Sequence, residues 1–237
     1  MAELFGNYAP EDLSGFSVRA IKFARARLAV LKSFIYELTE KNYEDIRIKD
    51  LCRDAEISEP SFYNYFPRKD DLFLYFISLW SVDVQLHCRE IKQGTETIRE
   101  LYRYTAANSA KNPGLIKEII AYQARTNTAQ SKEKVTSVTL AEKSILFGNV
   151  PGLAEIPDQG LGPVLIQNLT HAVDSGELPE SVSPQIYALI LASLFFGVPV
   201  ITIHNEPEKL AGYYDLAVNQ ILSTAKLQKG KHRRRTR

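Results

Sequence analysis

The chain has 237 residues, which is enough for one small domain and one larger domain. A hydrophobic fraction of 45% and a charged fraction of 24% are ordinary for a soluble globular protein. The two cysteines give neither a disulfide framework nor a metal-type spacing, and the first fifteen residues do not look like a signal peptide. We therefore expect a cytoplasmic protein that holds no metal ion and no cofactor.

The N-terminal part of the chain begins without a helical pattern. Gly6, Pro10 and Gly15 interrupt residues 1–17, and we predict a flexible arm there. Apolar residues then recur at spacings of three and four, which predicts an amphipathic helix that braces the segment after it. These residues are Ile21, Ala24, Leu28, Leu31, Ile35 and Leu38.

Two short helices are predicted next. The first has its apolar residues at i, i+3, i+4 and i+7, and these residues are Ile48, Leu51, Cys52 and Ala55. Ser58 is a good N-cap for the second helix, and Pro60 is tolerated in its first turn. Phe62 and Phe66 lie four apart and face inward, while Pro67 ends the helix. Such a pair forms a helix-turn-helix, whose second helix normally lies in the DNA major groove.

The run of residues 55–69 resembles the DNA-binding signature of TetR-type transcriptional repressors. The resemblance extends over about residues 30–73, and its order of residue types is specific. Beyond it, only the all-helical pattern and the length agree with that family. Glu56 stands where the family turn usually carries glycine, which implies less left-handed character or some strain. Arg47 stands where a threonine or serine usually caps the first short helix.

The resemblance implies which residues meet DNA. Base contacts set the sequence preference, and phosphate contacts set the affinity. Glu59 either accepts from cytosine N4 or points to solvent, and Ser61 reaches a base or a phosphate. Arg47, Lys49 and Lys69 are the phosphate candidates. The full set of candidate DNA-binding residues is Arg47, Lys49, Ser58, Glu59, Pro60, Ser61, Tyr63, Asn64, Tyr65 and Lys69.

Further cations lie close to this motif in the sequence. Lys22, Arg25 and Arg27 precede it, and Arg68 follows its second helix. The field at the contact face matters more for DNA binding than the net charge of +1. We interpret these cations as part of a basic face, and the alternative is a scatter of solvated charges.

The remaining helical pattern predicts a larger helical domain over residues 69–227, after a DNA-binding domain over residues 18–68. A helix over 69–91 links the two. Thr97 and Glu100 suggest a capping box for the next helix, Pro113 begins another, and a further helix is predicted over 131–147. Residues 148–163 have the composition of a loop, which could form a lid or the edge of a binding site.

The segment Ile186–Ile203 is apolar on almost every side, as in a buried or membrane-spanning helix. Pro199 interrupts it and no basic cluster flanks it closely, so we expect no membrane span. We expect burial against its own domain and against a second copy in a homodimer. The family resemblance implies that the last two long helices form the interface. The candidate contact residues are Ile190, Leu194, Tyr213, Leu216 and Ile221.

The resemblance also implies an effector site between the middle helices of the larger domain. Aromatic residues at helical spacing are more often core than pocket, but they suggest a small apolar or aromatic effector. The candidate ligand-binding residues are Trp80, Tyr102, Tyr122 and Phe147. Residues 228–237 are predicted to be a disordered basic tail, which either adds sequence-independent DNA affinity or merely aids solubility.

The sequence gives little support to an enzyme. The four histidines have no partner at catalytic or metal spacing, and neither a phosphate-binding glycine loop nor a nucleophile elbow is present. We therefore predict an all-α protein with a three-helix DNA-binding domain and a helical ligand-binding and dimerisation domain. Its expected function is that of a ligand-released homodimeric repressor at a palindromic double-stranded DNA operator. The alternative is a helical adaptor or scaffold protein without specific DNA binding.

Overall fold

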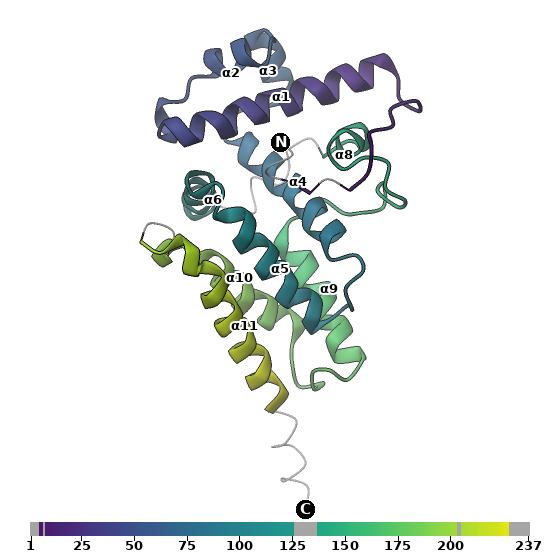
Figure 1. Ribbon diagram of the computed structural model, residues 1–237, viewed down its shortest axis with the longest axis vertical. Helices are drawn as coiled ribbons and strands as arrows, with labels where there is room; N and C mark the ends of the chain where they lie inside the picture. The colour runs from purple at the N-terminus through teal and green to yellow at the C-terminus, as the bar shows by residue number, and fades with distance from the viewer. Residues whose placement is uncertain (1–4, 7, 126–136, 203–204, 228–237) are drawn as a thin grey trace, which may run out of the picture. The chain divides into compact units, whose positions relative to one another are not determined.

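The structure is a computed structural model that describes residues 5–6, 8–125, 137–202 and 205–227 (Figure 1). Within these ranges every regular element is a helix, which confirms the all-α prediction. The predicted basic tail and the start of the helix predicted over 131–147 lie outside the described residues. The chain forms two compact units, one of Met1–Asp83 with Gly114–Asp158 and one of Val84–Pro113 with Gln159–Arg237.

The first unit is built around one long helix. α1 contacts α2 and α8, and α2 contacts α3 (Figure 1). Ser17 caps α1 by accepting a hydrogen bond from the backbone N–H of Ala20, and the predicted apolar stripe from Ala24 to Leu38 is buried. The helices are α1 (Val18–Glu40), η1 (Tyr43–Asp45), α2 (Ile48–Asp54), α3 (Glu59–Tyr65), the start of α4 (Asp71–His87), α6 (Pro113–Arg125) and α8 (Leu140–Phe147).

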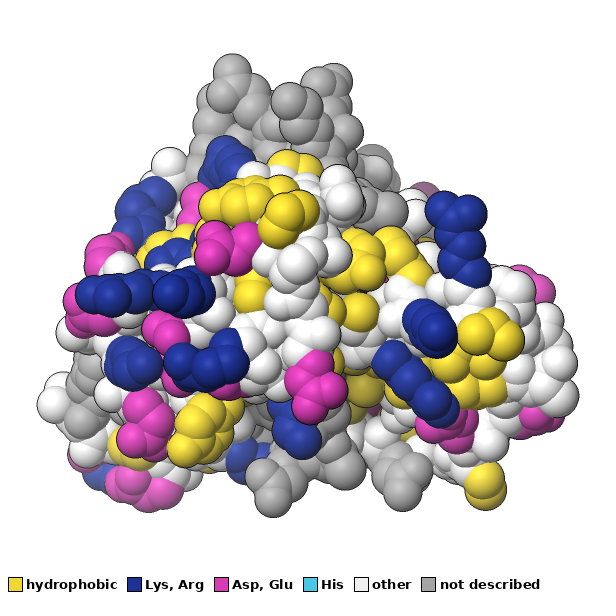
Figure 2. All heavy atoms as spheres, turned by 90° about the horizontal axis from the view of Figure 1, so that it is seen from above, with side chains coloured by type: hydrophobic (Ala, Val, Ile, Leu, Met, Phe, Trp, Pro, Cys, Tyr) yellow, Lys and Arg dark blue, Asp and Glu magenta, His cyan; other side chains and the backbone are white. Residues whose placement is uncertain are grey.

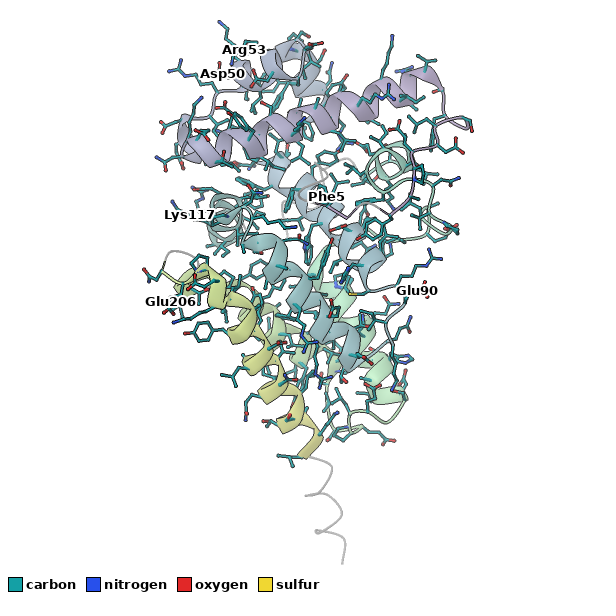
Figure 3. All side chains as sticks on the ribbon, viewed as in Figure 1. Phe5, Asp50, Arg53, Glu90, Lys117 and Glu206 are labelled. Atoms are coloured by element: carbon teal, nitrogen blue, oxygen red, sulfur yellow. The ribbon has the colours of Figure 1, made fainter. Side chains whose placement is uncertain are left out.

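Some residues of the N-terminal segment are packed, although a flexible arm was predicted over residues 1–17. Phe5 is buried (Figure 3). Its ring packs against those of Phe76 in α4 and Phe147 in α8, at centroid distances of 5.7 and 5.9 Å. The hydroxyl of Tyr8 donates to the buried carboxylate of Asp83 at 2.8 Å. The contacts of Phe5 and Tyr8 therefore hold the first described residues of the segment, whereas residues 10–12, 14, 15 and 17 are exposed.

Helix α8 is shorter than predicted within the described residues. Val138 lies outside any regular element, and the helix begins after the extended residue Thr139, which forms a capping box with Glu142. The ammonium of Lys143 donates to the carbonyl of Ile156 at 2.6 Å, and the backbone N–H of Val138 donates to the carboxylate of Asp158 at 2.9 Å. These bonds tie the segment 149–158 to α8, so the first part of the predicted loop is a braced turn.

The second unit packs four long helices. α5 contacts α9 and α11, and α10 contacts α9 and α11 (Figure 1). Its core is aromatic, because Tyr102 lies 5.6 Å from Phe195 and 5.0 Å from Tyr214 between ring centroids. The helices are α5 (Thr95–Ser109), α9 (Leu161–Asp174), α10 (Pro184–Thr202), η2 (Pro207–Lys209) and α11 (Leu210–Leu227).

Helix α5 begins differently from the prediction. Thr97 and Glu100 do not form a capping box, since the Thr97 hydroxyl donates to the carbonyl of Lys92. Instead, the helix begins after Gly94, and the carboxylate of Glu177 accepts from both the backbone N–H and the hydroxyl of Thr95. Its cap therefore comes from a residue distant in the sequence, which a local motif search does not detect.

Helix α10 matches the predicted apolar helix. By length and composition alone it could cross a membrane, and Pro199 lies within it. Within its own unit, the carbonyl of Leu191 accepts from the Tyr102 hydroxyl and that of Phe195 accepts from the Tyr214 hydroxyl, both at 2.6 Å. One side of α10 is therefore fixed to α5 and α11, as expected for a helix buried against its own domain.

Candidate nucleic-acid interface

The turn between α2 and α3 has the left-handed backbone conformation that glycine usually supplies. Glu56 has a φ of 54°, and it is the one non-glycine residue with positive φ among those described. The backbone N–H of Ile57 donates to the carbonyl of Cys52 at 2.9 Å, which closes the turn. The turn thus keeps the geometry of a helix-turn-helix and accepts the strain of a side chain at this position.

The second helix of the motif begins and ends at the predicted residues. The Ser58 hydroxyl accepts a hydrogen bond from the backbone N–H of Ser61 at 3.3 Å, and Pro60 lies in the first turn. Phe66 is the C-cap, directly before Pro67. The side chains of Phe62 and Phe66 are fully buried, as predicted, so they fix α3 to the unit from behind.

The opposite side of α3 faces solvent. Ser58, Glu59, Pro60 and Asn64 are exposed, and Tyr63 has half of its surface accessible, at 50%. Ser61 and Tyr65 are partly covered, and the Tyr65 ring packs edge-on against Phe23 of α1 at 5.2 Å. The structure therefore brings the predicted base-contacting residues together on one accessible face, with Tyr65 at its edge.

Lys69 is directed into the unit. Its ammonium donates to the carbonyl oxygens of Tyr43 and Ile46 at 2.7 and 2.8 Å, and it lies 4.0 Å from the centre of the Tyr43 ring. Burial lowers the pKa of this ammonium group. Lys69 therefore braces the turn that leads into α2, which the sequence pattern did not indicate.

The two other phosphate candidates are exposed. Arg47 is the N-cap residue of α2 without a side-chain capping bond, as its residue type implied, and Lys49 is in the first turn. Nearby, Arg53 pairs with Asp50 at 2.9 Å (Figure 3). Arg68 pairs with Asp70. Figure 2 shows lysine and arginine side chains spread over this face among acidic and apolar ones. Arg47 and Lys49 have no ion pair within the described part of the chain.

Arg27 corrects the interpretation of the cations as one basic face. Its side chain is fully buried, and its Nη1 lies 3.1 Å from Glu142 of α8. The sequence spacing indicates this burial, because Arg27 lies on the same apolar stripe of α1 as Ala24, Leu28 and Leu31. A charged residue in such a register is buried only when it is paired.

The candidate ligand-binding aromatics are divided between the two units. The Tyr122 ring packs tilted against Phe73 in the first unit at 5.3 Å, and Phe147 packs against Phe5 in the same unit. Tyr102 belongs to the aromatic core of the second unit, whereas Trp80 is partly exposed on α4. Three of the four are thus covered by neighbouring side chains within their own units.

The candidate dimer residues lie on two neighbouring helices. On α10, exposed apolar side chains follow a helical stripe at Ile186, Leu189, Ile190, Val200 and Ile201. On α11, Tyr213, Leu216 and Leu227 are exposed. Of the predicted contacts, Ile190, Tyr213 and Leu216 belong to these exposed sets, while Leu194 and Ile221 are partly covered.

The N-terminal motif matches a known family model. Residues 36–76 match the model described as bacterial regulatory proteins of the tetR family. This range contains α2, α3 and the turn with Glu56, together with the start of α4. No curated protein sequence matches the chain.

Solved structures share the fold across both units. A TetR transcriptional regulator from Rhodococcus sp. RHA1 has 16% identity and a TM-score of 0.56, covering 84% of this chain and 96% of its own. Thermus thermophilus FadR, solved with lauroyl-CoA, has 16% identity and a TM-score of 0.60, covering 83% and 93%. FadR from Bacillus subtilis, solved with stearoyl-CoA, has 13% identity and a TM-score of 0.61, covering 83% and 97%.

These similarities agree with the expectation that the chain is not an enzyme, since the matched proteins are transcriptional regulators. The family match covers the motif whose exposed face carries the candidate base contacts, and the structural matches cover most of the chain. Residues 36–76 of the chain therefore match the DNA-binding domain model of the tetR family, and the chain shares the fold of solved TetR-type transcriptional regulators.

Proposed function

We propose that the protein is a cytoplasmic, homodimeric repressor that binds a palindromic DNA operator and is released by a small molecule. The observation that supports this function best is the accessible face of α3. Ser58, Glu59, Pro60, Tyr63 and Asn64 are all exposed, while the opposite side of the helix is anchored by fully buried phenylalanines. A helix held in this way can enter a major groove without losing its packing.

The proposed dimer would use the exposed stripes of α10 and α11. Leu189 and Leu216 are 69% and 70% exposed, and exposed apolar side chains gathered on two adjacent helices indicate a surface that another protein covers. A symmetric pair presents two reading helices, which must be about 34–36 Å apart to reach successive major grooves. The dimer is thus what would convert one exposed helix into a reader of a palindrome.

The proposed effector is a small apolar or aromatic molecule. Two of the structural relatives were solved with acyl-CoA molecules, so long acyl chains are the first candidates of the apolar class. An effector changes DNA affinity only if it binds one arrangement of the two DNA-binding domains of the dimer more tightly than another. Lauroyl-CoA and a set of simple phenols are suitable probes of the two classes.

In vitro selection from random duplex DNA tests this function. We expect enrichment of a palindrome whose half-sites are about one helical turn apart. Tyr63→Ala should weaken operator binding roughly 10-fold, and Tyr36→Ala, which removes an exposed tyrosine of α1, should leave it unchanged. Arg47→Ala should weaken binding to all sequences and reduce the slope of log affinity against log salt by about one.

The adaptor alternative predicts the opposite outcome. Selection would then enrich no sequence, and the Tyr63→Ala and Tyr36→Ala variants would behave alike. Operator binding by a protein that stays monomeric would contradict the proposed dimer alone, since one head can still contact a half-site.

A further inference from the structure

One buried carboxylate joins three helices of the first unit. Glu142 in α8 is fully buried, and its Oε1 accepts from the Tyr75 hydroxyl of α4 at 2.6 Å. The same oxygen lies 3.1 Å from Nη1 of Arg27 in α1. Its Oε2 accepts from the backbone N–H and the hydroxyl of Thr139 at 2.6 and 2.8 Å. Both oxygens are therefore engaged at once by α1, by α4 and by the N-cap of α8.

The cation of this pair faces the DNA-reading helix. The Arg27 guanidinium carbon lies 5.1 Å from the ring centre of Phe66, the C-cap of α3. It also lies 5.3 Å from Phe23 and 4.2 Å from Tyr75, so aromatic rings surround it. Phe23 in turn packs against Tyr65 at the end of α3. Two aromatic contacts thus connect the guanidinium to the C-terminal end of the reading helix.

The carboxylate of Glu142, the anion of this pair, is bonded to the N-cap of α8. Because Glu142 forms the capping box with Thr139, its carboxylate keeps its position only while the first turn of α8 is formed. That turn is held by the segment 149–158, through the bonds from Lys143 to Ile156 and from Val138 to Asp158. A shift of this segment would therefore move the carboxylate that Arg27 depends on.

We propose that the Arg27–Glu142 pair couples helix α8 to the DNA-reading helix α3, so that DNA binding at α3 and the order of the first turn of α8 stabilise each other. A buried charge cannot remain without its partner, because removal of one member of such a pair is strongly destabilising. We therefore expect the Arg27–Glu142 contact to be either fully formed or fully broken. Coupling between two sites is reciprocal, so DNA must affect α8 if α8 affects DNA binding.

Hydrogen exchange of the full-length protein tests this proposal, which rests on the proposed DNA-binding function. Exchange is followed by mass spectrometry with and without the selected operator duplex, in peptides from α3 and from residues 140–147. In the unmodified protein we expect DNA to slow exchange in both regions, by roughly 5-fold or more in α8. The measurement needs no knowledge of the effector.

The decisive variant combines Arg27→Met with Glu142→Gln. It removes both buried charges together, and glutamine keeps an acceptor for the cap at Thr139, so the fold should persist. In this variant DNA should still slow exchange in α3 but no longer in α8. The matched control is Arg103→Met with Asp215→Asn, which removes a partly exposed pair of the second unit with an N–O distance of 2.9 Å. It should retain both effects.

A second variant covers the case in which the double variant does not fold. Arg27→Lys keeps a charge for Glu142 but loses the planar group that faces Phe66 and Phe23, so the effect of DNA on α8 should fall by at least half. Slowed exchange in α3 alone in the unmodified protein would refute the coupling and leave the proposed function intact. An unchanged effect on α8 in the variants would refute it as well. Absence of any effect at α3 would refute the proposed function and the coupling with it.

Discussion

The two compact units differ in the groups that are unfavourable where they lie, which are buried charged groups in the first unit and exposed apolar side chains in the second. The first unit buries charged groups and pairs them, as with Arg27 and Glu142 and with Asp83, whose carboxylate accepts from Gly6 and Tyr8. The second unit leaves apolar side chains on α10 and α11 exposed, and Ile201 is 74% accessible. The first unit thus supplies partners for these buried carboxylates from within itself, whereas the second unit exposes an apolar surface that the proposed dimer would cover. We expect mutations in the first to act on folding and mutations on the stripes of the second to act on association.

The largest effect is expected from breaking the buried pair in one unit. Glu142→Ala leaves the guanidinium of Arg27 buried without its carboxylate, and it should reduce the free energy of unfolding by about 3–5 kcal/mol. Chemical denaturation monitored by circular dichroism measures this change. Asp215→Ala breaks a partly exposed pair with Arg103 and should cost less than about 1 kcal/mol. Equal costs for the two variants would contradict the contrast between the buried pair and the exposed one.

The next effect concerns the second unit and its exposed stripes. Leu189→Glu together with Leu216→Glu places two carboxylates on the proposed interface of each copy. The dimer dissociation constant should rise at least about 100-fold, which corresponds to about 2.7 kcal/mol. Sedimentation velocity over a concentration series measures it. Val18→Glu alters an exposed valine of α1 and should leave association unchanged, while a loss of helical signal in the double variant would point to a folding role for these leucines.

A smaller effect is expected where the N-terminal segment crosses α8. Gly148 has a φ of 76°, and a Cβ added there would collide with the carbonyl oxygen of Ala9. Gly148→Ala should therefore lower the free energy of unfolding by about 2 kcal/mol. Gly212→Ala in α11 is the control, since a Cβ there meets open space and should stabilise the helix by up to about 1 kcal/mol. A neutral Gly148→Ala would show that the segment around Ala9 is loosely held.

The smallest effect on stability is expected in the turn between α2 and α3. Glu56 has a φ of 54°, so Glu56→Gly should relieve strain and stabilise the unit by up to about 1 kcal/mol. Calorimetry is sensitive enough to detect the corresponding rise in melting temperature. Glu59→Gly in the first turn of α3 should act in the opposite direction, because glycine is unfavourable within a helix. A lower melting temperature for Glu56→Gly would mean that the glutamate side chain makes a contribution larger than the strain.

Sequence reasoning succeeded where the physical cause is local. Ser58, Pro60 and Pro67 define the limits of α3 through capping and the missing N–H of proline, which act within a few residues. The candidate base contacts, which the family resemblance implied for the same stretch, stay a prediction, and most of them are exposed. The strain at Glu56 was one of two outcomes that the residue type allowed, and the positive φ selects it.

The expectations that differed depend on partners far along the chain. Arg27 looks like one more cation near the motif until Glu142 is placed beside it, and Lys69 looks like a phosphate contact until the carbonyls of Tyr43 and Ile46 are seen. Likewise, the cap of α5 comes from Glu177. Such pairings depend on tertiary packing, which residue type and spacing do not encode.

The distance in sequence between Arg27 and Glu142 has a consequence for biosynthesis. The ribosome releases α1, α2 and α3 long before α8, because Glu142 in α8 lies 115 residues after Arg27 in the sequence. Until α8 emerges, the guanidinium of Arg27 stays solvated, whereas it is buried in the finished protein. The DNA-binding domain can therefore complete its packing only after α8 has been synthesised. Expression of residues 18–68 by themselves should accordingly give a poorly ordered fragment, even though they contain the whole motif.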